Sequence, residues 1–280
     1  MIGRHRSRRP GDDRVLPATR WVAIAIVPFL VVAVVVLVSA PDRTGELFAW
    51  PIAPPLSALV LASAYLGGIV YFLAVWDARR WHRVRHGLPA VAVFAAAMLA
   101  STLLHLDRFS ANLPFAVWLV LYATTPLAMV GLLVLQRGSD PGIPDAVDVD
   151  VPAPARVVLA AIGLAALACG TVALVAPAWV AELWAWQLTP LTARATGAVL
   201  TLSGVVNAAM LRDARWSAFR ALFAAQLVSL AAIVASLVAR RDDLAWDRPL
   251  TAPFVALVAL AALAYGAVAA TCELRLRRAR

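Results

Sequence analysis

Long apolar stretches alternate with short polar segments along the whole chain. Each apolar stretch has roughly 20 residues, the length that an α-helix needs to cross about 30 Å of hydrocarbon. Lipid offers the backbone no hydrogen-bond partners, so spans of this kind must be helical. The pattern therefore predicts an all-α integral membrane protein with eight transmembrane helices. The expected helices cover residues 21–40, 56–76, 88–106, 115–135, 157–176, 195–211, 218–239 and 254–271.

A pentapeptide from the first half of the chain recurs in the second half. Glu46-Leu-Phe-Ala-Trp50 returns there as Glu182-Leu-Trp-Ala-Trp186. Two further pairs of segments recur at nearly the same offset: Asp77-Ala-Arg-Arg-Trp81 with Asp213-Ala-Arg-Trp216, and Asp107-Arg108 with Asp247-Arg248. These matches predict an internal duplication.

The duplication divides the chain into two repeats of four spans each, residues 21–136 and residues 156–272. Because each repeat has an even number of spans, both enter the membrane in the same direction. The repeats are then parallel and related by an axis along the membrane normal. Residues 137–155 are rich in proline and aspartate, which disfavours a helix. We expect a cytoplasmic linker there, with docking of a partner as the open alternative.

Arginine residues orient the predicted helices. All 25 Lys-or-Arg residues are arginine; nineteen fall in the tails, the linker and alternate loops, and six in the remaining loops. Because basic residues accumulate in cytoplasmic loops, we expect residues 1–20 and 273–280 to be basic cytoplasmic tails of a multi-pass protein in a bacterial plasma membrane. The first span follows a positive segment, as a signal peptide does. It is longer than the usual apolar region and has a counterpart in the second repeat, so we expect it to be retained.

Composition agrees with this class and excludes others. Hydrophobic residues make up 62% of the chain, charged residues only 15%, and the mean hydropathy is +0.81. That leaves too little polar surface for a water-soluble domain of this size. The net charge of +9 lies in loops and tails, so we expect contact with anionic lipids at the cytoplasmic face and no nucleic-acid partner. A membrane-protein partner and a homo-oligomer both stay open.

The ten tryptophans all fall at or near the ends of the predicted helices. Indole rings favour the level of the lipid headgroups. We therefore expect these side chains to anchor the protein at the two membrane surfaces.

Several runs of residues resemble other membrane proteins. FAWPIAPPLSA (48–58), HLDRF (105–109), WLVLYATTP (118–126) and WAWQLTPLTAR (184–194) resemble a group of uncharacterised multi-span membrane proteins of actinobacterial type. The resemblance covers most of the first repeat and part of the second. It implies a source for the chain, and it brings no activity, cofactor or site.

Motifs of enzymes and cofactor sites are absent from the sequence. It contains no Gly-rich phosphate loop, no zinc-protease helix and no nucleophile elbow. Cys169 and Cys272 lie at different predicted depths and no Cys/His spacing suits a metal, so we expect no metal and no cofactor. His105 lies close to Asp107 at the outer end of the third span. This pair is open to two interpretations, a proton relay or an interfacial histidine bonded to its neighbours.

The centres of the predicted spans hold no Asp, Glu or Arg, which argues against a buried-carboxylate proton antiporter. The strongest polar residues inside the spans are Asn207 and Gln226. Each is a candidate for lining a cavity, and each would alternatively make an interhelical hydrogen bond.

The paired outer loops are the remaining candidate ligand site. Glu46, Trp50, Glu182 and Trp186 would place carboxylates and indoles in a two-fold vestibule that receives a cationic or amphipathic ligand. In the alternative interpretation the glutamates cap short interfacial helices, which the indoles anchor. The candidate site is completed by His105, Asp107, Arg108, Asp247 and Arg248.

Three functions are compatible with these observations. The parallel duplication favours a transporter of a small molecule or lipid with an outward-facing site between the repeats. That preference rests on analogy with other proteins of this shape. A non-catalytic structural or accessory subunit would explain the lack of buried charge. A lipid-modifying enzyme would need a polar cluster at one interface, for which His105 and Asp107 are the candidates.

Overall fold

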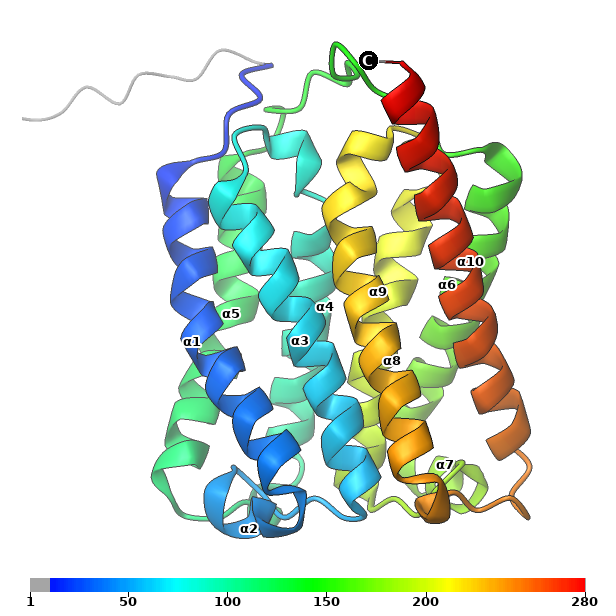
Figure 1. Cartoon of the computed structure of the whole chain (residues 1–280). Coiled ribbons are helices and arrows are strands. Elements are labelled where there is room, and N and C mark those ends of the chain that lie inside the picture. The colour runs from blue at the N-terminus through cyan, green and yellow to red at the C-terminus, as the bar shows by residue number, and fades with distance from the viewer. Residues whose placement is uncertain (1–10, 280) are drawn as a thin grey trace, which may run out of the picture.

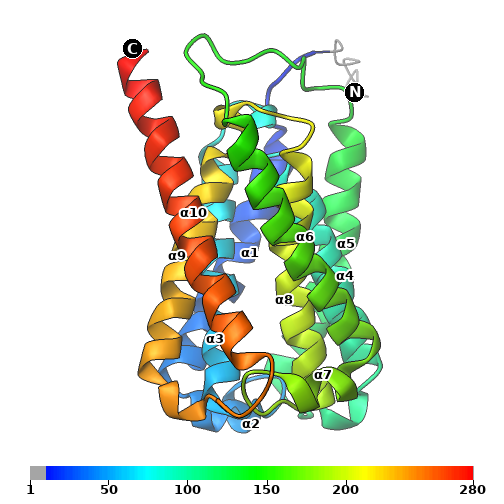
Figure 2. The same ribbon diagram turned by 90° about the vertical axis from the view of Figure 1, so that its right-hand side faces the viewer.

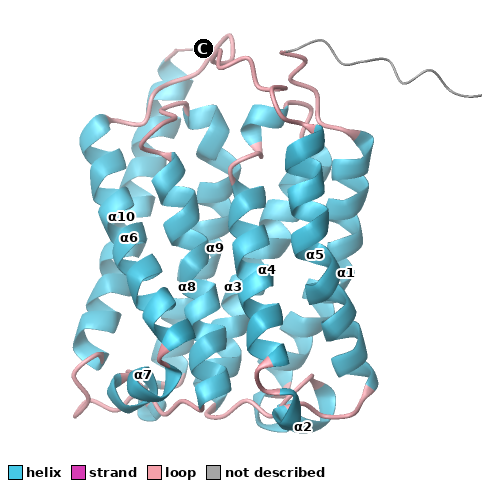
Figure 3. Ribbon diagram, turned by 180° about the vertical axis from the view of Figure 1, so that it is seen from behind, coloured by secondary structure: helices cyan, strands magenta, loops and turns pink. Residues whose placement is uncertain are grey.

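The computed structural model describes residues 11–279, and this part of the chain is helical with no β-sheet (Figures 1 and 3). Long helices run between the two ends of the molecule. The short helices α2 (Thr44–Leu47) and α7 (Pro177–Leu183) are both found at the same end. The long helices are α1 (Pro17–Ser39), α3 (Pro55–Asp77), α4 (Gly87–Leu103), α5 (Leu113–Leu135), α6 (Ala153–Val175), α8 (Pro190–Ala209), α9 (Trp216–Ala239) and α10 (Thr251–Arg278). Single 3-10 turns precede or follow them at Pro41–Arg43, Trp81–Arg83, Leu106–Arg108 and Arg241–Asp243.

Six of the long helices are long and apolar enough to cross a membrane, namely α1, α3, α5, α6, α9 and α10. The all-α prediction is confirmed, and these helices agree with the predicted membrane class. Helix α4 has only 17 residues, and α8, with 20, carries Arg194 and several threonines. Length and composition by themselves do not assign α4 and α8 to the membrane.

Some helix boundaries differ from those expected from hydropathy. Helix α1 begins at Pro17, inside the expected basic tail, because proline suits the first turn of a helix. Helix α10 continues to Arg278, so most of the expected C-terminal tail is helical. There Glu273 accepts hydrogen bonds from Trp216 Nε1 at 2.9 Å and from Arg220. The apolar part of α10 ends before the helix itself ends, because residues beyond the membrane need no apolar side chains.

The helices pack in a central group with two flanks (Figure 1). Helix α3 packs against α9, and α4 packs against α8. Helices α1 and α5 pack on α3 and α4, whereas α6 and α10 pack on α8 and α9. The contacts between α1 and α5 and between α6 and α10 are few, and Figure 2 shows α6 and α10 on the side of the molecule that faces the viewer. We refer to residues 17–135 as the N-terminal half and to residues 153–278 as the C-terminal half.

Glycines bring neighbouring helices into backbone contact. A Cβ atom at Gly170 of α6 would lie 2.6 Å from the carbonyl oxygen of Gly197 on α8, and one at Gly197 would lie 2.7 Å from the carbonyl oxygen of Gly170. At Gly67 of α3, a Cβ would lie 2.9 Å from the carbonyl oxygen of Ala225 on α9. Small residues thus set the helix spacing in both places, as in other membrane bundles.

The end that carries α2 and α7 holds several buried tryptophans, among them the three of the repeated segments. We call this the tryptophan end. Trp50, Trp184 and Trp186 are at most 2% exposed, because the chain folds back into the bundle after α2 and α7. Rings of the two halves pack in separate groups, with Trp50 4.9 Å from Trp118 and Trp186 5.3 Å from Phe254 between centroids. The expected surface anchoring therefore does not apply to these three indoles, nor to Trp81, Trp118 and Trp216, which are also buried.

The opposite end carries the 78–86 and 210–215 loops, residues 11–16 and the C-terminus of α10 (Figure 1). We call it the arginine end. Arg215 lies 2.6 Å from Asp213 and 2.7 Å from Asp140, and all three side chains are largely buried. Burial by itself raises the pKa of Asp213, but hydrogen bonds from Arg215 and His86 hold that pKa well below its ordinary value.

The segment between α5 and α6 is part of this ionic cluster. Asp140 binds Arg215, Asp145 accepts from Arg83, and Asp148 accepts from Ser217. These aspartates are each paired with groups of the 78–86 and 210–215 loops or of the first turn of α9. The 137–155 segment, which joins the two halves in sequence, is therefore bound to the bundle.

Gly170→Ala should destabilise the fold by about 1–3 kcal/mol, because the added methyl group overlaps backbone atoms of α8. The measurement is thermal unfolding of the purified protein in detergent. Gly266→Ala is the matched control, since a Cβ at Gly266 of α10 meets no atom within 4 Å, and it should be neutral or slightly stabilising. Identical unfolding curves for both variants would contradict the α6–α8 contact.

Asp213→Asn should lower stability at neutral pH by about 3 kcal/mol, because it leaves Arg215 partly unpaired in a buried site. The depressed pKa of Asp213 adds stability that is fully present above the unfolded pKa, near 3.8, and is lost as the pH falls below it. Between about pH 5 and pH 3 the wild type should therefore lose more stability than the variant. Parallel pH profiles of the unfolding temperature would contradict this assignment.

Candidate functional site

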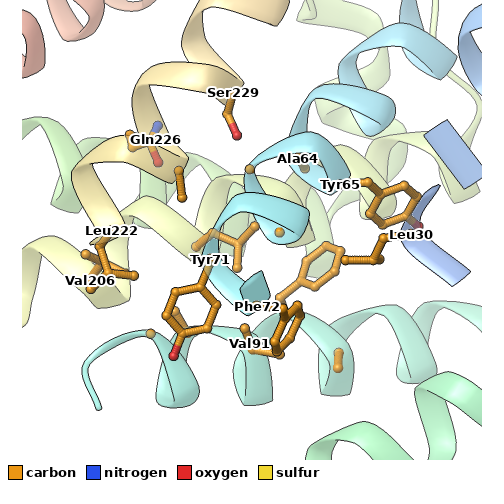
Figure 4. A pocket seen from close by; sticks show the side chains of 18 of the residues that line it. Leu30, Ala64, Tyr65, Tyr71, Phe72, Val91, Val206, Leu222, Gln226 and Ser229 are labelled. Atoms are coloured by element: carbon orange, nitrogen blue, oxygen red, sulfur yellow. The ribbon is translucent and has the colours of Figure 1, made fainter. Parts of the chain in front are cut away.

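A cavity of about 120 Å³ lies at the centre of the bundle, between the N-terminal and C-terminal halves. Tyr65, Tyr71 and Phe72 of α3 and Gln226 and Ser229 of α9 line it (Figure 4). Residues of α1, α4, α5, α8 and α10 complete the wall. The cavity thus exists only where the two halves meet.

A second cavity of about 210 Å³ lies in the C-terminal half, between α6, α8, α9 and α10, with α3 as its inner wall. It shares with the central cavity the lining residues Ala64, Leu202, Gln226, Ser229 and Tyr265. The two cavities are therefore adjacent, and Gln226 faces both.

In the N-terminal half the corresponding space is a pair of grooves between α1 and α5, of about 320 and 560 Å³. Their walls include exposed residues such as Val120 and Leu113. Tyr65 and Tyr122 line both the smaller groove and the central cavity. The hollow spaces form a series that crosses the bundle from the α1–α5 flank to the α6–α10 flank.

Tyrosines separate the spaces of this series. The hydroxyl of Tyr122 lies 2.9 Å from that of Tyr65, and the hydroxyl of Tyr265 donates to Asn207 Oδ1 at 2.5 Å. Asn207 also donates to the Leu159 carbonyl at 2.7 Å, is fully buried and lines none of these cavities. It is an interhelical hydrogen-bonding residue, whereas Gln226 has no hydrogen-bond partner among the described residues and lines two cavities.

None of the described residues that line these cavities is Asp, Glu, Arg or His. An ion placed there would lose its hydration without gaining a counter-charge, which costs several kcal/mol. The spaces therefore suit an uncharged, largely apolar molecule.

The glutamates and indoles of the candidate vestibule are not on one surface. Glu46 is paired with Arg43 at 2.8 Å and is 68% exposed, and Glu182 is also exposed. Trp50 and Trp186 are buried beneath them, and Trp186 Nε1 donates to Ser57 Oγ at 2.8 Å. A ligand at the surface of the tryptophan end would meet the carboxylates without reaching these indoles, because the chain turns into the bundle after each glutamate.

His105 and Asp107 are not paired. Nδ1 of His105 donates to the Ser101 carbonyl and Nε2 accepts from Arg194 Nη1, both at 3.0 Å. Asp107 is paired with Arg108 at 3.0 Å, and both are 71% exposed. The structure therefore provides no His–Asp relay here, since the 3-10 turn after α4 directs Asp107 to the surface.

Arg248 does not pair with Asp247, which is exposed. Its Nη1 donates to the carbonyl oxygens of Ala181, Trp184 and Trp186 at 2.9, 3.4 and 3.2 Å. These oxygens belong to the end of α7 and the segment that follows, where a helix leaves carbonyls without partners. Arg248 therefore holds the buried tryptophan segment in place.

A buried polar cluster at the arginine end was missed by the sequence analysis. His82 Nδ1 lies 2.5 Å from Asp13 Oδ2 and its Nε2 lies 3.2 Å from Ser217 Oγ, which donates to Asp148. None of the cavities described above is lined by these residues, so the cluster joins segments rather than receiving a ligand. The separation in sequence between Asp13 and Asp148, and between His82 and Ser217, is nearly the offset of the repeated segments. If the predicted duplication is extended into the N-terminal tail, it therefore pairs the members of this cluster.

Comparisons with protein-family models, with curated proteins and with solved structures found no match.

Arg248→Ala should destabilise the protein by about 2 kcal/mol, because buried carbonyl groups lose a charged donor. Arg108→Ala is the matched control: Arg108 holds the corresponding place in the other half but makes only an exposed ion pair, so its loss should cost at most about 0.5 kcal/mol. Thermal unfolding in detergent measures both. A larger effect at Arg108 than at Arg248 would contradict the role of Arg248.

Proposed function

We propose that all eight long helices cross the membrane as two parallel four-helix repeats. The helix contacts support this because they correspond in pairs: α1–α3 with α6–α8, α4–α5 with α9–α10, and α3–α9 with α8–α4. A pseudo-two-fold axis along the membrane normal relates such pairs. Helices α4 and α8 lie at the centre of the bundle, where most of their residues are buried or half-buried, so they need not be as apolar as a lipid-facing helix.

Corresponding backbone hydrogen bonds also support the duplication. At the tryptophan end Ser110 N donates to Ala49 O at 2.9 Å, and Ala245 N donates to Ala185 O at 2.8 Å. At the arginine end Trp81 N donates to Asp13 O and Trp216 N donates to Val149 O, both at 2.8 Å. Each donor in the first half is separated from its counterpart in the second half by the offset of the sequence repeat, to within a single position, and the same holds for the acceptors.

The proposed orientation places the arginine end in the cytoplasm of a bacterial cell. Both termini are then cytoplasmic, and exposed arginines of the 78–86 and 210–215 loops, such as Arg79 and Arg212, face the anionic inner leaflet of the plasma membrane. The tryptophan end faces outward.

The function that these observations support best is a membrane transporter for an uncharged small molecule or lipid. The observation that carries it is the series of adjoining cavities without charged lining, at the junction of two similar halves. Junctions between repeats are where transporters commonly bind their substrates. The proposed site lies inside the bundle, beneath the buried indoles, and not among the exposed glutamates of the outer loops.

Flux into liposomes that contain the purified protein tests the proposal. The panel consists of radiolabelled uncharged solutes and of lipids with a fluorescent acyl chain, compared with protein-free liposomes. Val91→Phe, which narrows the central cavity, should reduce flux at least about tenfold, the effect of roughly 1.4 kcal/mol on a barrier. Leu263→Phe is the control, since Leu263 is 73% exposed on α10. No flux above the protein-free level for any compound would refute transport.

A structural or accessory subunit of a membrane complex is the second candidate. It is favoured by the ties that hold the two halves together at both ends. At the tryptophan end Trp186 binds Ser57, and Asp243 accepts from Leu56 N at 3.2 Å. At the arginine end the cluster around Arg215 and His82 joins both halves. Such ties oppose the rocking movement that alternating access requires.

Native mass spectrometry of membranes solubilised in mild detergent tests the second candidate. An accessory subunit should appear in a complex of constant composition, with a second copy of the chain or with another membrane protein. Isolated single chains together with measurable flux would favour transport instead.

A further inference from the structure

Gln226 presents an unpaired amide to the central cavity. It lines both the central and the second cavity, and its amide has no hydrogen-bond partner among the described residues. Its nitrogen and oxygen are not among the unpaired side-chain atoms that are closed off from solvent, whereas the indole nitrogens of Trp50 and Trp184 are. Ala224 and Val228, two positions away on either side, are exposed. Because two residues turn a helix by about 200°, Gln226 lies on the opposite face of α9, toward the inside of the bundle.

Ser229 lies one helical turn from Gln226 on α9 and lines the same two cavities (Figure 4). Its hydroxyl donates to the Ser63 carbonyl at 2.9 Å, so its oxygen keeps lone pairs that can accept a hydrogen bond. The Gln226 amide both donates and accepts. Side chains three positions apart on a helix are separated by only about 5–6 Å at Cβ, so the polar head of one ligand can reach both.

The other polar groups of the central cavity have partners within the protein or within reach on their own helix. The tyrosine hydroxyls are engaged as follows: Tyr65 with Tyr122, Tyr71 with the Val84 carbonyl, and Tyr265 with Asn207. The Thr125 hydroxyl has no partner among the described residues, but a threonine hydroxyl can turn to a carbonyl of the preceding helical turn. The unpaired polar groups that lie side by side are therefore those of α9.

The matching positions in the N-terminal half are apolar. Val91 and Phe94 of α4 also line the central cavity. They precede Gln226 and Ser229 by the offset that relates the two proposed repeats, to within a single position. The cavity therefore has a polar side on α9 and an apolar side on α4, at corresponding positions of the two repeats. A molecule with a polar head and an apolar body fits such a cavity in one orientation.

We propose that Gln226 and Ser229 determine which molecule the central cavity binds: an uncharged molecule with a hydroxyl or carboxamide head, whose apolar body lies against Val91 and Phe94. Either head both donates and accepts, as this pair of side chains requires. A charged head would find no counter-charge, because no described residue that lines the cavity is Asp, Glu, Arg or His. The inference deepens the proposed function and rests on it for the claim that the bound molecule is also the transported substrate.

Equilibrium binding of decyl compounds to the full-length protein in nanodiscs tests the proposal. Decanol and decanamide carry the two candidate heads, decyl methyl ether can only accept a hydrogen bond, and undecane can neither donate nor accept. Binding is measured as the saturable excess over protein-free nanodiscs, because all these compounds partition into the bilayer. Decanol or decanamide should bind at least about tenfold more tightly than the ether and undecane, the effect of roughly 1.4 kcal/mol. Comparison of the two identifies the head.

Gln226→Leu should weaken binding of the preferred compound about tenfold, because the amide is lost while most of the side-chain volume is kept. Ser229→Ala should weaken it by a smaller factor, since one acceptor is lost. Ser203→Ala is the matched control. The Ser203 hydroxyl lines the second cavity but not the central one and bonds to the Leu200 carbonyl at 3.3 Å, so binding should not change.

Narrowing each cavity separately tests which of the two holds the ligand. Of these two cavities, Val91 lines only the central one and Leu257 only the second. Val91→Phe should weaken binding of the preferred compound at least about tenfold, whereas Leu257→Phe should leave it unchanged.

Equal binding of all the decyl compounds by the wild type, or no saturable binding of any, would overturn the inference, and this result does not depend on any variant. So would binding that is indifferent to Gln226→Leu, or a larger loss with Leu257→Phe than with Val91→Phe. Head-dependent binding with no flux in liposomes would retain the site and refute the transport function. Flux of other solutes without such binding would do the reverse.

Discussion

The packing of α3 against α9 and of α4 against α8 is the contact on which the rest of the structure depends. It joins the two halves of the chain through small residues such as Gly67, which lies against the backbone of α9. Because these four helices occupy the centre, α1 makes few contacts with α5, and α6 makes few contacts with α10. The hollow spaces of the protein follow from this arrangement, since they lie where the flanking helices fail to close.

Charge is confined to the two ends of the bundle, and this confinement explains how the halves are held. Ion pairs inside a membrane are expensive, so the electrostatic ties lie at the arginine end, where Asp213 of the C-terminal half binds His86 of the N-terminal half as well as Arg215. At the tryptophan end, the hydrogen bonds from Trp186 to Ser57 and from Leu56 N to Asp243 join the two halves. Between the ends, helix packing and a few hydroxyl and amide groups hold the helices together.

The chemical character of the candidate site follows from the confinement of charged groups to the two ends. A cavity without charged groups favours uncharged ligands, and Gln226 lines two of these cavities with an amide that has no hydrogen-bond partner among the described residues. The exposed glutamates at the surface lie outside it. The repeated Glu-Leu-aromatic-Ala-Trp segment instead supplies buried rings to the walls and packing of the bundle, as Trp184 illustrates.

The sequence by itself determined the helical class and the approximate positions of the helices, because hydropathy depends only on neighbouring residues. It also identified Gln226 as a polar residue within a span. Only the tertiary structure decided that Asn207 is satisfied by Leu159 and Tyr265 while Gln226 faces cavities. The same holds for His105, which binds Arg194 instead of Asp107. Such pairings join residues far apart in the chain, and helix packing, which no local pattern encodes, determines which of them meet.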